Sequence, residues 1–157
     1  MMRVGMGYDV HRLVAGCPCW LGGVEIPYEK GLSGYSDGDV LLHAICDALL
    51  GAASEGDLGR HFPEGDPQWK GIRSLIILEE VYRLLSKKGY QVRNVDGVLI
   101  AEGPRIAPFV GQMKVKISQA LGVTPDDVNV KATTNERIGF IGRGEGIAAQ
   151  AVCLLER

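Results

Sequence analysis

The chain has 157 residues, enough to bury a substantial hydrophobic core, and we expect one domain spanning residues 1–157. Its formal net charge is −2, so it lacks the basic excess that is typical of nucleic-acid-binding proteins. The N-terminal residues form no apolar leader and no stretch is long enough to span a membrane, so the composition predicts a cytoplasmic protein with reduced cysteines.

The first predicted element is a β-strand over residues 3–11, where the side chains alternate in character. One face of this strand carries apolar residues, and the other carries Gly5, Gly7, Asp9 and His11. The two glycines should leave open space on the face that carries Asp9 and His11. An Asp-x-His pair is common by chance, and the alternative is an ordinary strand end at the surface.

A short apolar helix follows the Ser-Asp-Gly-Asp run, and Asp37 or Asp39 can cap its N-terminus. Asp39, His43 and Asp47 are four residues apart, so we expect them near one another along this helix. A histidine with carboxylates one turn away is well placed to bind a metal, with a carboxylate orienting its ring. The alternative is a structural histidine held by hydrogen bonds.

The remaining elements are predicted from periodicity and from glycine and proline positions: a hairpin over 20–26, loops over 27–35 and 56–71, helices over 74–88 (with Ser74 as N-cap) and 108–121, and strands over 90–101, 128–133 and 147–155. The long polar loop over 56–71 is either functional or a mobile surface lid. The last strand is mostly apolar, which indicates a central strand or a subunit contact. This order predicts an α+β fold, a mixed α/β sandwich in which one mixed sheet has helices packed on one face, plus a small hairpin.

Three residues from the first strand and the first helix form a candidate metal site. Asp9, His11 and His43 supply one carboxylate and two imidazoles, which would leave one zinc position open, as in catalytic zinc sites. Glu136 follows two threonines in a loop and suits a harder cation such as Mg²⁺ or Mn²⁺.

A glycine-flanked arginine, Arg143, could pair with a phosphate or form a salt bridge with Glu145. The chain has no Walker A loop and no evident serine or cysteine nucleophile beside a base. These features favour metal-assisted phosphoryl chemistry without a covalent enzyme intermediate.

Five motifs, in order along nearly the whole chain, together resemble the family of 2-C-methyl-D-erythritol 2,4-cyclodiphosphate synthases: Gly7-Tyr8-Asp9-Val10-His11, Ser36-Asp37-Gly38-Asp39 with His43-Ala44, Gly56-Asp57-Leu58-Gly59, Asn129-Val130-Lys131-Ala132-Thr133-Thr134 and Gly142-Arg143-Gly144-Glu145-Gly146. The resemblance implies a phosphorus–oxygen lyase of the non-mevalonate isoprenoid pathway. Its substrate would be 4-diphosphocytidyl-2-C-methyl-D-erythritol 2-phosphate, whose 2-phosphate attacks its own β-phosphorus and displaces CMP. The resemblance also implies a homotrimer with active sites between subunits.

The same resemblance implies roles for individual residues. Asp9, His11 and His43 match zinc ligands, Glu136 matches the ligand of a second cation (Mg²⁺ or Mn²⁺), and Thr134 matches a residue that stabilises the transition state. Residues 101–107 with 132–133 match the cytidine pocket, and residues 57–59 with 62–66 match the segments around the methylerythritol phosphate. Tyr8, Phe140, Arg143 and Glu145 match positions near a central cavity that takes up an isoprenoid diphosphate in some members. The implied substrate-binding residues are Asp9, His11, Tyr35, Ser36, Asp57, Leu58, Gly59, Phe62, Pro63, Glu64, Gly65, Asp66, Ala101, Glu102, Gly103, Pro104, Arg105, Ile106, Ala107, Ala132, Thr133, Thr134, Asn135, Glu136, Phe140 and Arg143.

The chain departs from the family pattern at two places. Tyr35 stands where the family commonly has a histidine, and a phenol can donate a hydrogen bond to phosphate but stays neutral near pH 7. Tyr35 is therefore a candidate catalytic residue that would act as a neutral hydrogen-bond donor. The lid reads Pro63-Glu64-Gly65-Asp66 in place of Pro-Asp-Thr-Asp, and the glycine should loosen the lid and weaken its grip on substrate.

Two other functions fit the same residues. A zinc-dependent phosphoesterase would use water as its nucleophile and release an open phosphate product. A non-catalytic trimer would bind isoprenoid diphosphates and keep zinc only for structure. Product analysis and alanine replacements at His11 and Glu136 distinguish these alternatives.

Overall fold

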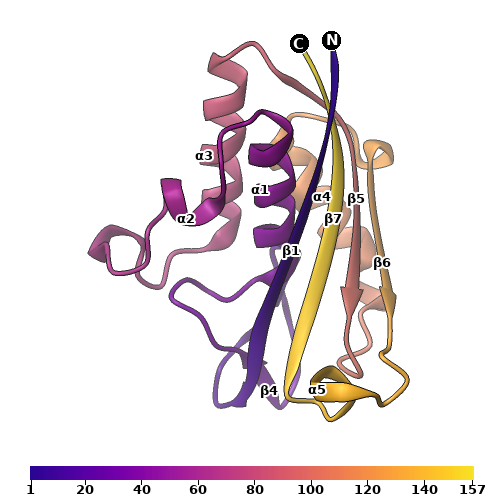
Figure 1. Cartoon of the computed structure of the whole chain (residues 1–157). Coiled ribbons are helices and arrows are strands. Elements are labelled where there is room, and N and C mark those ends of the chain that lie inside the picture. The colour runs from indigo at the N-terminus through magenta and orange to yellow at the C-terminus, as the bar shows by residue number, and fades with distance from the viewer.

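A mixed sheet forms one layer of the molecule, and helices cover one of its faces (Figure 1). The computed structural model describes all of residues 1–157. Its elements are β1 (Met2–Ala15), β2 (Cys19–Leu21), β3 (Val24–Ile26), β4 (Lys30–Leu32), α1 (Val40–Ala52), α2 (Leu58–His61), η1 (Pro67–Trp69), α3 (Ser74–Lys87), β5 (Gln91–Ile100), η2 (Ala107–Phe109), α4 (Val110–Leu121), η3 (Pro125–Asp127), β6 (Val128–Thr133), α5 (Gly139–Gly142) and β7 (Gly146–Glu156). The predicted fold class, including the separate β2–β3 hairpin, is confirmed.

The five-stranded sheet has the order β4-β1-β7-β5-β6. Strand β7 pairs antiparallel with both β1 and β5, and β5 pairs parallel with β6, so the last strand is central, which is the first of the two alternatives left open by the sequence. The expectation of a plain loop over 27–35 is wrong, because β4 pairs with the end of β1 through Leu13 and Leu32. Strand β1 therefore runs four residues beyond its predicted end at His11, to Ala15.

The helix α1 packs unusually close to β1, and two glycines make this possible. A Cβ atom on Gly5 would lie 1.8 Å from the carbonyl oxygen of Ala48, and one on Gly7 would lie 1.9 Å from that of Ala44. The expectation that these glycines leave open space is wrong, because the backbone of α1 fills it. The same close packing brings His43, next to Ala44, toward the strand residues that follow Gly7.

The N-terminus of α1 is capped by Asp39, one of the two predicted caps. Its carboxylate accepts hydrogen bonds from the backbone N–H groups of Leu42, Gly22 and Gly23. The side chain is fully buried, and burial raises its pKa above the ordinary value. Asp39 therefore ties the β2–β3 turn to α1, and its carboxylate makes no hydrogen bond to the imidazole of His43, near which the four-residue spacing had placed it.

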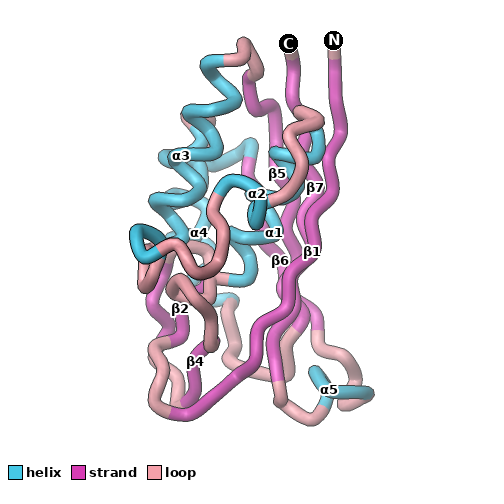
Figure 2. Tube along the Cα trace, turned by 60° about the vertical axis from the view of Figure 1, so that its left-hand side comes forward, coloured by secondary structure: helices cyan, strands magenta, loops and turns pink.

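The helices α3 and α4 complete the helical layer, and α2 and η1 lie in the loop that connects α1 to α3 (Figures 1 and 2). Helix α3 begins at Ser74, as predicted, but its N-cap is Arg73 and Ser74 does not cap it. The loop over 56–71 carries helical turns, each capped by an aspartate: Asp57 caps α2 and Asp66 caps η1. None of the helices has the length and apolar character needed to cross a bilayer.

The face of the sheet that the helices leave uncovered carries a row of apolar side chains. Val4, Met6, Tyr8 and Val10 on β1 are exposed, with Met6 reaching 72%, and Val152 on β7 is opposite Met6 in the strand register. Monomeric proteins rarely expose contiguous apolar patches of this kind.

Candidate metal centre and substrate clefts

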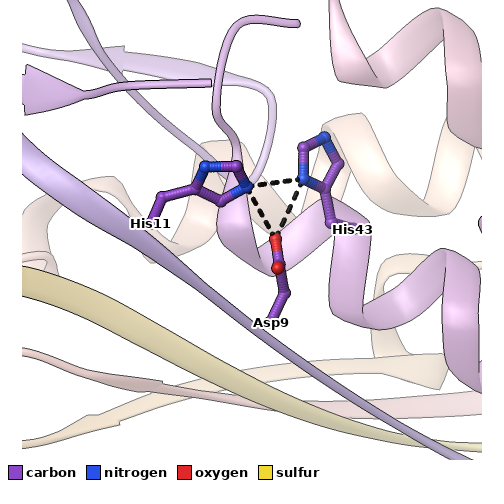
Figure 3. Close-up of side chains that lie close together, drawn as sticks. All are labelled: Asp9, His11 and His43. Atoms are coloured by element: carbon purple, nitrogen blue, oxygen red, sulfur yellow. Dashed lines mark hydrogen bonds and ion pairs between the residues drawn. The ribbon is translucent and has the colours of Figure 1, made fainter. Parts of the chain in front are cut away.

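Three side chains converge between β1 and α1 (Figure 3). Oδ2 of Asp9 lies 2.9 Å from Nε2 of His11 and 3.0 Å from Nδ1 of His43, and the two nitrogens are 3.2 Å apart. Ligand atoms around a tetrahedral zinc with bonds of about 2.0–2.1 Å stand roughly 3.3 Å from one another. The three atoms therefore have the spacing and the N₂O chemistry of three zinc ligands, and a fourth position would stay open.

A backbone contact sets the orientation of His11. Its Nδ1 lies 2.7 Å from the carbonyl oxygen of Ser33. A carbonyl can only accept, so Nδ1 carries a proton, and in the neutral ring Nε2 then presents a lone pair toward Asp9 and His43. This is the arrangement that metal-ligating histidines usually have.

The electrostatics of the site favour a positive charge. Burial by itself raises the pKa of Asp9, but hydrogen bonds and charge interactions with His11 and His43 outweigh it and lower the pKa to about 2. Burial likewise lowers the pKa of His11, and the hydrogen bond and charge of Asp9 outweigh that and raise it. The ionised carboxylate thus stabilises cationic charge next to it, whether that is a proton on an imidazole or a metal ion.

A cavity of about 310 Å³ opens beside the three side chains, and the loop that carries α2 and η1 forms part of its wall. It is lined by Asp9, Val10, His11, Tyr35, Ser36, His43, Asp47, Leu58, Gly59, Phe62, Glu64, Trp69 and Ile77. Of the residues assigned to this region, Asp57, Pro63, Gly65 and Asp66 do not line it. Gly65 has a φ of 95°, a backbone conformation that favours glycine, so the lid turn is built around this residue.

Four residues of the cavity wall were not among the sequence-predicted site residues: Val10, Asp47, Trp69 and Ile77. Asp47 could have been identified from the sequence, because it lies one helical turn beyond His43. Its carboxylate accepts a hydrogen bond of 2.7 Å from the N–H of Leu58 and so fixes the start of α2. Trp69 packs edge-on against Phe62. Trp69 reaches the cavity wall through contacts within the loop, and no pattern in the sequence predicts such contacts.

Tyr35 lies at the lid side of the cavity. Its hydroxyl donates a hydrogen bond of 3.0 Å to the carbonyl oxygen of Asp66, and its own carbonyl accepts one of 2.8 Å from the N–H of Gly71. Tyr35 therefore connects the loop before α1 to both sides of η1. To donate to a substrate phosphate, the phenol would have to leave Asp66.

A second cleft, of about 470 Å³, lies at the β5–β6 side of the sheet. All residues assigned to the cytidine pocket except Gly103 line this cleft. Thr134, for which the resemblance implies a role in stabilising the transition state, lines it too. The lining residues are Ala101, Glu102, Pro104, Arg105, Ile106, Ala107, Val110, Val130, Lys131, Ala132, Thr133 and Thr134. Val110, Val130 and Lys131 were not predicted, although Val130 and Lys131 stand directly before Ala132 on β6.

The turn after β6 carries Glu136, the predicted ligand of the second cation. One carboxylate oxygen of Glu102 accepts hydrogen bonds from the N–H groups of Asn135 and Arg137, at 3.0 and 3.1 Å. Glu136 itself has a φ of 51°, so its backbone is held in a tight left-handed turn. It does not belong to the group formed by the three candidate zinc ligands.

The glycine-rich segment before β7 shows the second of the two contacts considered for Arg143. Its guanidinium Nε lies 2.7 Å from a carboxylate oxygen of Glu145. Phe140 and Glu145 line a small groove that also contains Val10 and His11. The four cysteines are all free thiols, in agreement with the sequence-based expectation.

The comparisons with known proteins agree over the full length of the chain. The model of the YgbB family matches residues 2–156. The 2-C-methyl-D-erythritol 2,4-cyclodiphosphate synthase of Thiobacillus denitrificans is 60% identical over 156 residues, which cover 99% of this chain and 98% of that protein. The corresponding protein of Desulforamulus reducens is 58% identical and covers 99% of each chain.

Solved structures show the same fold. A 2C-methyl-D-erythritol-2,4-cyclodiphosphate synthase in a CDP-bound form superposes with a TM-score of 0.90 at 35% identity, covering 98% of this chain and 100% of that one. The bifunctional IspDF from Campylobacter jejuni gives a TM-score of 0.95 at 38% identity, covering 99% of this chain and 42% of that longer chain.

Proposed function

This chain belongs to the YgbB family, and we propose on that premise that it converts 4-diphosphocytidyl-2-C-methyl-D-erythritol 2-phosphate into 2-C-methyl-D-erythritol 2,4-cyclodiphosphate and CMP. It is thus a phosphorus–oxygen lyase of the non-mevalonate isoprenoid pathway. The observation that carries the proposal on the structural side is the convergence of Asp9, His11 and His43 beside a cavity that the loop over 56–71 helps to line. We assign the protein to the cytoplasm, a location that its free thiols support.

The nucleophile in this reaction belongs to the substrate, so the protein has to position two phosphates and stabilise charge. Asp9, His11 and His43 would hold a zinc ion, which supplies Lewis-acid polarisation of a phosphate oxygen when bound. The cavity wall at Phe62 and Ile77 would pack against the methylerythritol carbons and exclude water from the β-phosphorus that the 2-phosphate attacks. Exclusion of water favours ring closure over hydrolysis, because the competing nucleophile is kept out.

Within one chain, the proposed second cation site lies far from the three candidate zinc ligands. Thr134 and Glu136 follow β6, and β7 and β5 separate β6 from β1. Since neighbouring strands are about 4.8 Å apart, three such steps place β6 roughly 14 Å from β1. Two-metal phosphoryl-transfer sites hold their cations about 4 Å apart. We therefore infer that the Glu136 cation, Mg²⁺ or Mn²⁺, joins the zinc site of a neighbouring subunit.

The cleft at β5–β6 is the proposed cytidine pocket. Residues 101–102, 104–107 and 132–133 in its walls would recognise the base through backbone groups, and a relative of this chain has been solved in a CDP-bound form. Thr134, at the end of this cleft, would donate a hydrogen bond to the phosphate chain that leads from the cytidine to the zinc site. Tyr35 would do so from the lid side after release of Asp66.

Assembly into a homotrimer would cover the exposed apolar face of β1 and β7. Met6 and Val152 lie directly opposite each other in the register and are 72% and 46% exposed. We further assign the groove at Phe140, near the Arg143–Glu145 pair, to a central cavity in which an isoprenoid diphosphate could bind.

Replacing both Met6 and Val152 with Glu should dissociate the trimer, because an unpaired carboxylate buried in an apolar interface costs about 3 kcal/mol or more. Sedimentation velocity of wild type and variant measures the change, and turnover should fall with the trimer fraction. Ile76→Glu is the matched control, since Ile76 is a comparably exposed apolar residue on α3 and should leave the assembly intact. A double variant that stays trimeric would contradict the interface.

The reaction itself is tested by incubating the protein with the cytidylyl substrate, zinc and magnesium, followed by phosphorus NMR. We expect equimolar CMP and a cyclic diphosphate. An open phosphate product would favour the zinc-dependent phosphoesterase, and the absence of any conversion by zinc-loaded protein would favour a binding function.

A further inference from the structure

We propose that Ser74 and Asp37 form a hydrogen-bonded relay that positions His43, so that its Nδ1 lone pair faces Asp9 and His11. The inference rests on the zinc site proposed above and adds two residues on the far side of the imidazole ring. Figure 3 shows the ring of His43 with one nitrogen directed at Asp9 and the other directed away from it. The relay concerns this second nitrogen, Nε2.

The shortest contact of Nε2 is made by a buried hydroxyl group. Oγ of Ser74 lies 2.8 Å from it, and Ser74 is completely buried at the first residue of α3. The same Oγ donates a hydrogen bond to Oδ1 of Asp37, whose side chain is only 5% exposed. From the protein interior to the metal site, the groups therefore follow in the order Asp37 carboxylate, Ser74 hydroxyl, His43 imidazole.

The surroundings of Asp37 place its carboxylate as an acceptor of hydrogen bonds. It accepts from the backbone N–H groups of Ser74 and Asp39, at 3.0 and 3.1 Å, and faces Nε of Arg73 at 3.4 Å in an ion pair. The guanidinium of Arg73 is held in turn against the ring of Trp20, 3.4 Å from the ring centre. All of these partners are donors or cations, so the carboxylate of Asp37 accepts in each of these contacts.

The direction of the relay follows from that carboxylate. Because Asp37 accepts in this contact, the hydroxyl proton of Ser74 points to Asp37 and a lone pair of Oγ points to His43. Nε2 of His43 must then carry the proton of the neutral ring, which leaves Nδ1 as the free base. The tautomer that a metal ion requires at Nδ1 is thus selected by two residues that do not contact the metal position.

The two histidines of the site are oriented in different ways. His11 is fixed by the backbone carbonyl of Ser33, which no substitution can remove, whereas His43 depends on side chains. Oγ of Ser36 lies 3.1 Å from Nε2 and could take over part of the role of Ser74. The sequence suggested an orienting carboxylate on the helix of His43 itself; the structure supplies Asp37, acting through Ser74.

The relay predicts that Ser74→Ala weakens zinc binding about 10- to 100-fold, the usual effect of removing the partner of a metal-ligating histidine. Zinc affinity is measured by competition with a chromogenic chelator, in the full-length protein. Asp37→Asn should weaken binding too, because the amide can donate to Ser74 and so reverse the direction of the relay. In the zinc-loaded protein, the Nε2 proton of His43 should give a protected downfield NMR signal that Ser74→Ala abolishes; the chain has only three histidines to assign.

Ser118→Ala is the matched control, since Ser118 is also buried in a helix and donates to a backbone carbonyl, that of Val115. It should match Ser74→Ala in the melting temperature of the zinc-free protein, and it should keep wild-type zinc affinity. Zinc affinity within about threefold of wild type in Asp37→Asn and in Ser36→Ala/Ser74→Ala would overturn the relay. A wild-type protein that binds no zinc in the same titration would instead overturn the metal site on which the relay rests.

Discussion

His11→Ala should lose zinc binding and reduce turnover by about 10³-fold or more, because Lewis-acid stabilisation of phosphate charge contributes several kcal/mol to the barrier. The variant removes Nε2, which lies within 2.9 Å of Asp9 and 3.2 Å of Nδ1 of His43. The remaining two ligands cannot hold the ion tightly. Zinc content after dialysis and the rate of CMP release measure the two effects separately.

The control for this variant is His61→Ala. His61 is outside the metal site, where its Nε2 donates to the carbonyl oxygen of Glu55, and zinc content should stay at the wild-type level. The proposed trimer should persist in both variants, since neither side chain belongs to the exposed face of β1 and β7. Full turnover in His11→Ala would refute the metal role assigned to it.

Gly7→Ala should destabilise the protein by about 3 kcal/mol or more, because a methyl group at this position would overlap the backbone of α1. The added Cβ would lie 1.9 Å from the carbonyl oxygen of Ala44, an atom of a helix backbone that cannot rotate away. Relief requires α1 to move off the sheet, and His43 moves with it. Denaturant unfolding at fixed protein concentration and zinc affinity should both report the change.

Gly111→Ala provides the matched comparison. Gly111 is exposed near the start of α4 with no atom within 4 Å of its ideal Cβ position, so alanine should leave stability unchanged or raise it by up to about 1 kcal/mol. If Gly7→Ala were as stable as Gly111→Ala and retained zinc affinity, the close packing of α1 on β1 would not be what forms the site.

Local sequence patterns determined most of the secondary structure. Helix α4 ends at Gly122, which has a φ of 64°, and both the apolar alternation of β6 and the mostly apolar run of β7 predicted strands of the sheet. Short elements escaped prediction, because β4 and the turns α2 and η1 form through long-range pairing and aspartate caps. Periodicity needs several repeats to be detectable, and these elements have only three or four residues.

The ligand types of the metal site were also determined by the sequence, since Asp9 and His11 share one strand face and His43 lies on the following helix. What only the tertiary structure decided is which atoms meet. The four-residue spacing grouped Asp39 with His43, but burial directs Asp39 to the glycine turn of the β2–β3 hairpin, and Asp37 reaches His43 only through Ser74 on α3. Sequence spacing describes one element at a time, whereas a hydrogen-bond partner depends on which elements pack together and how closely, and here the glycines of β1 set that distance.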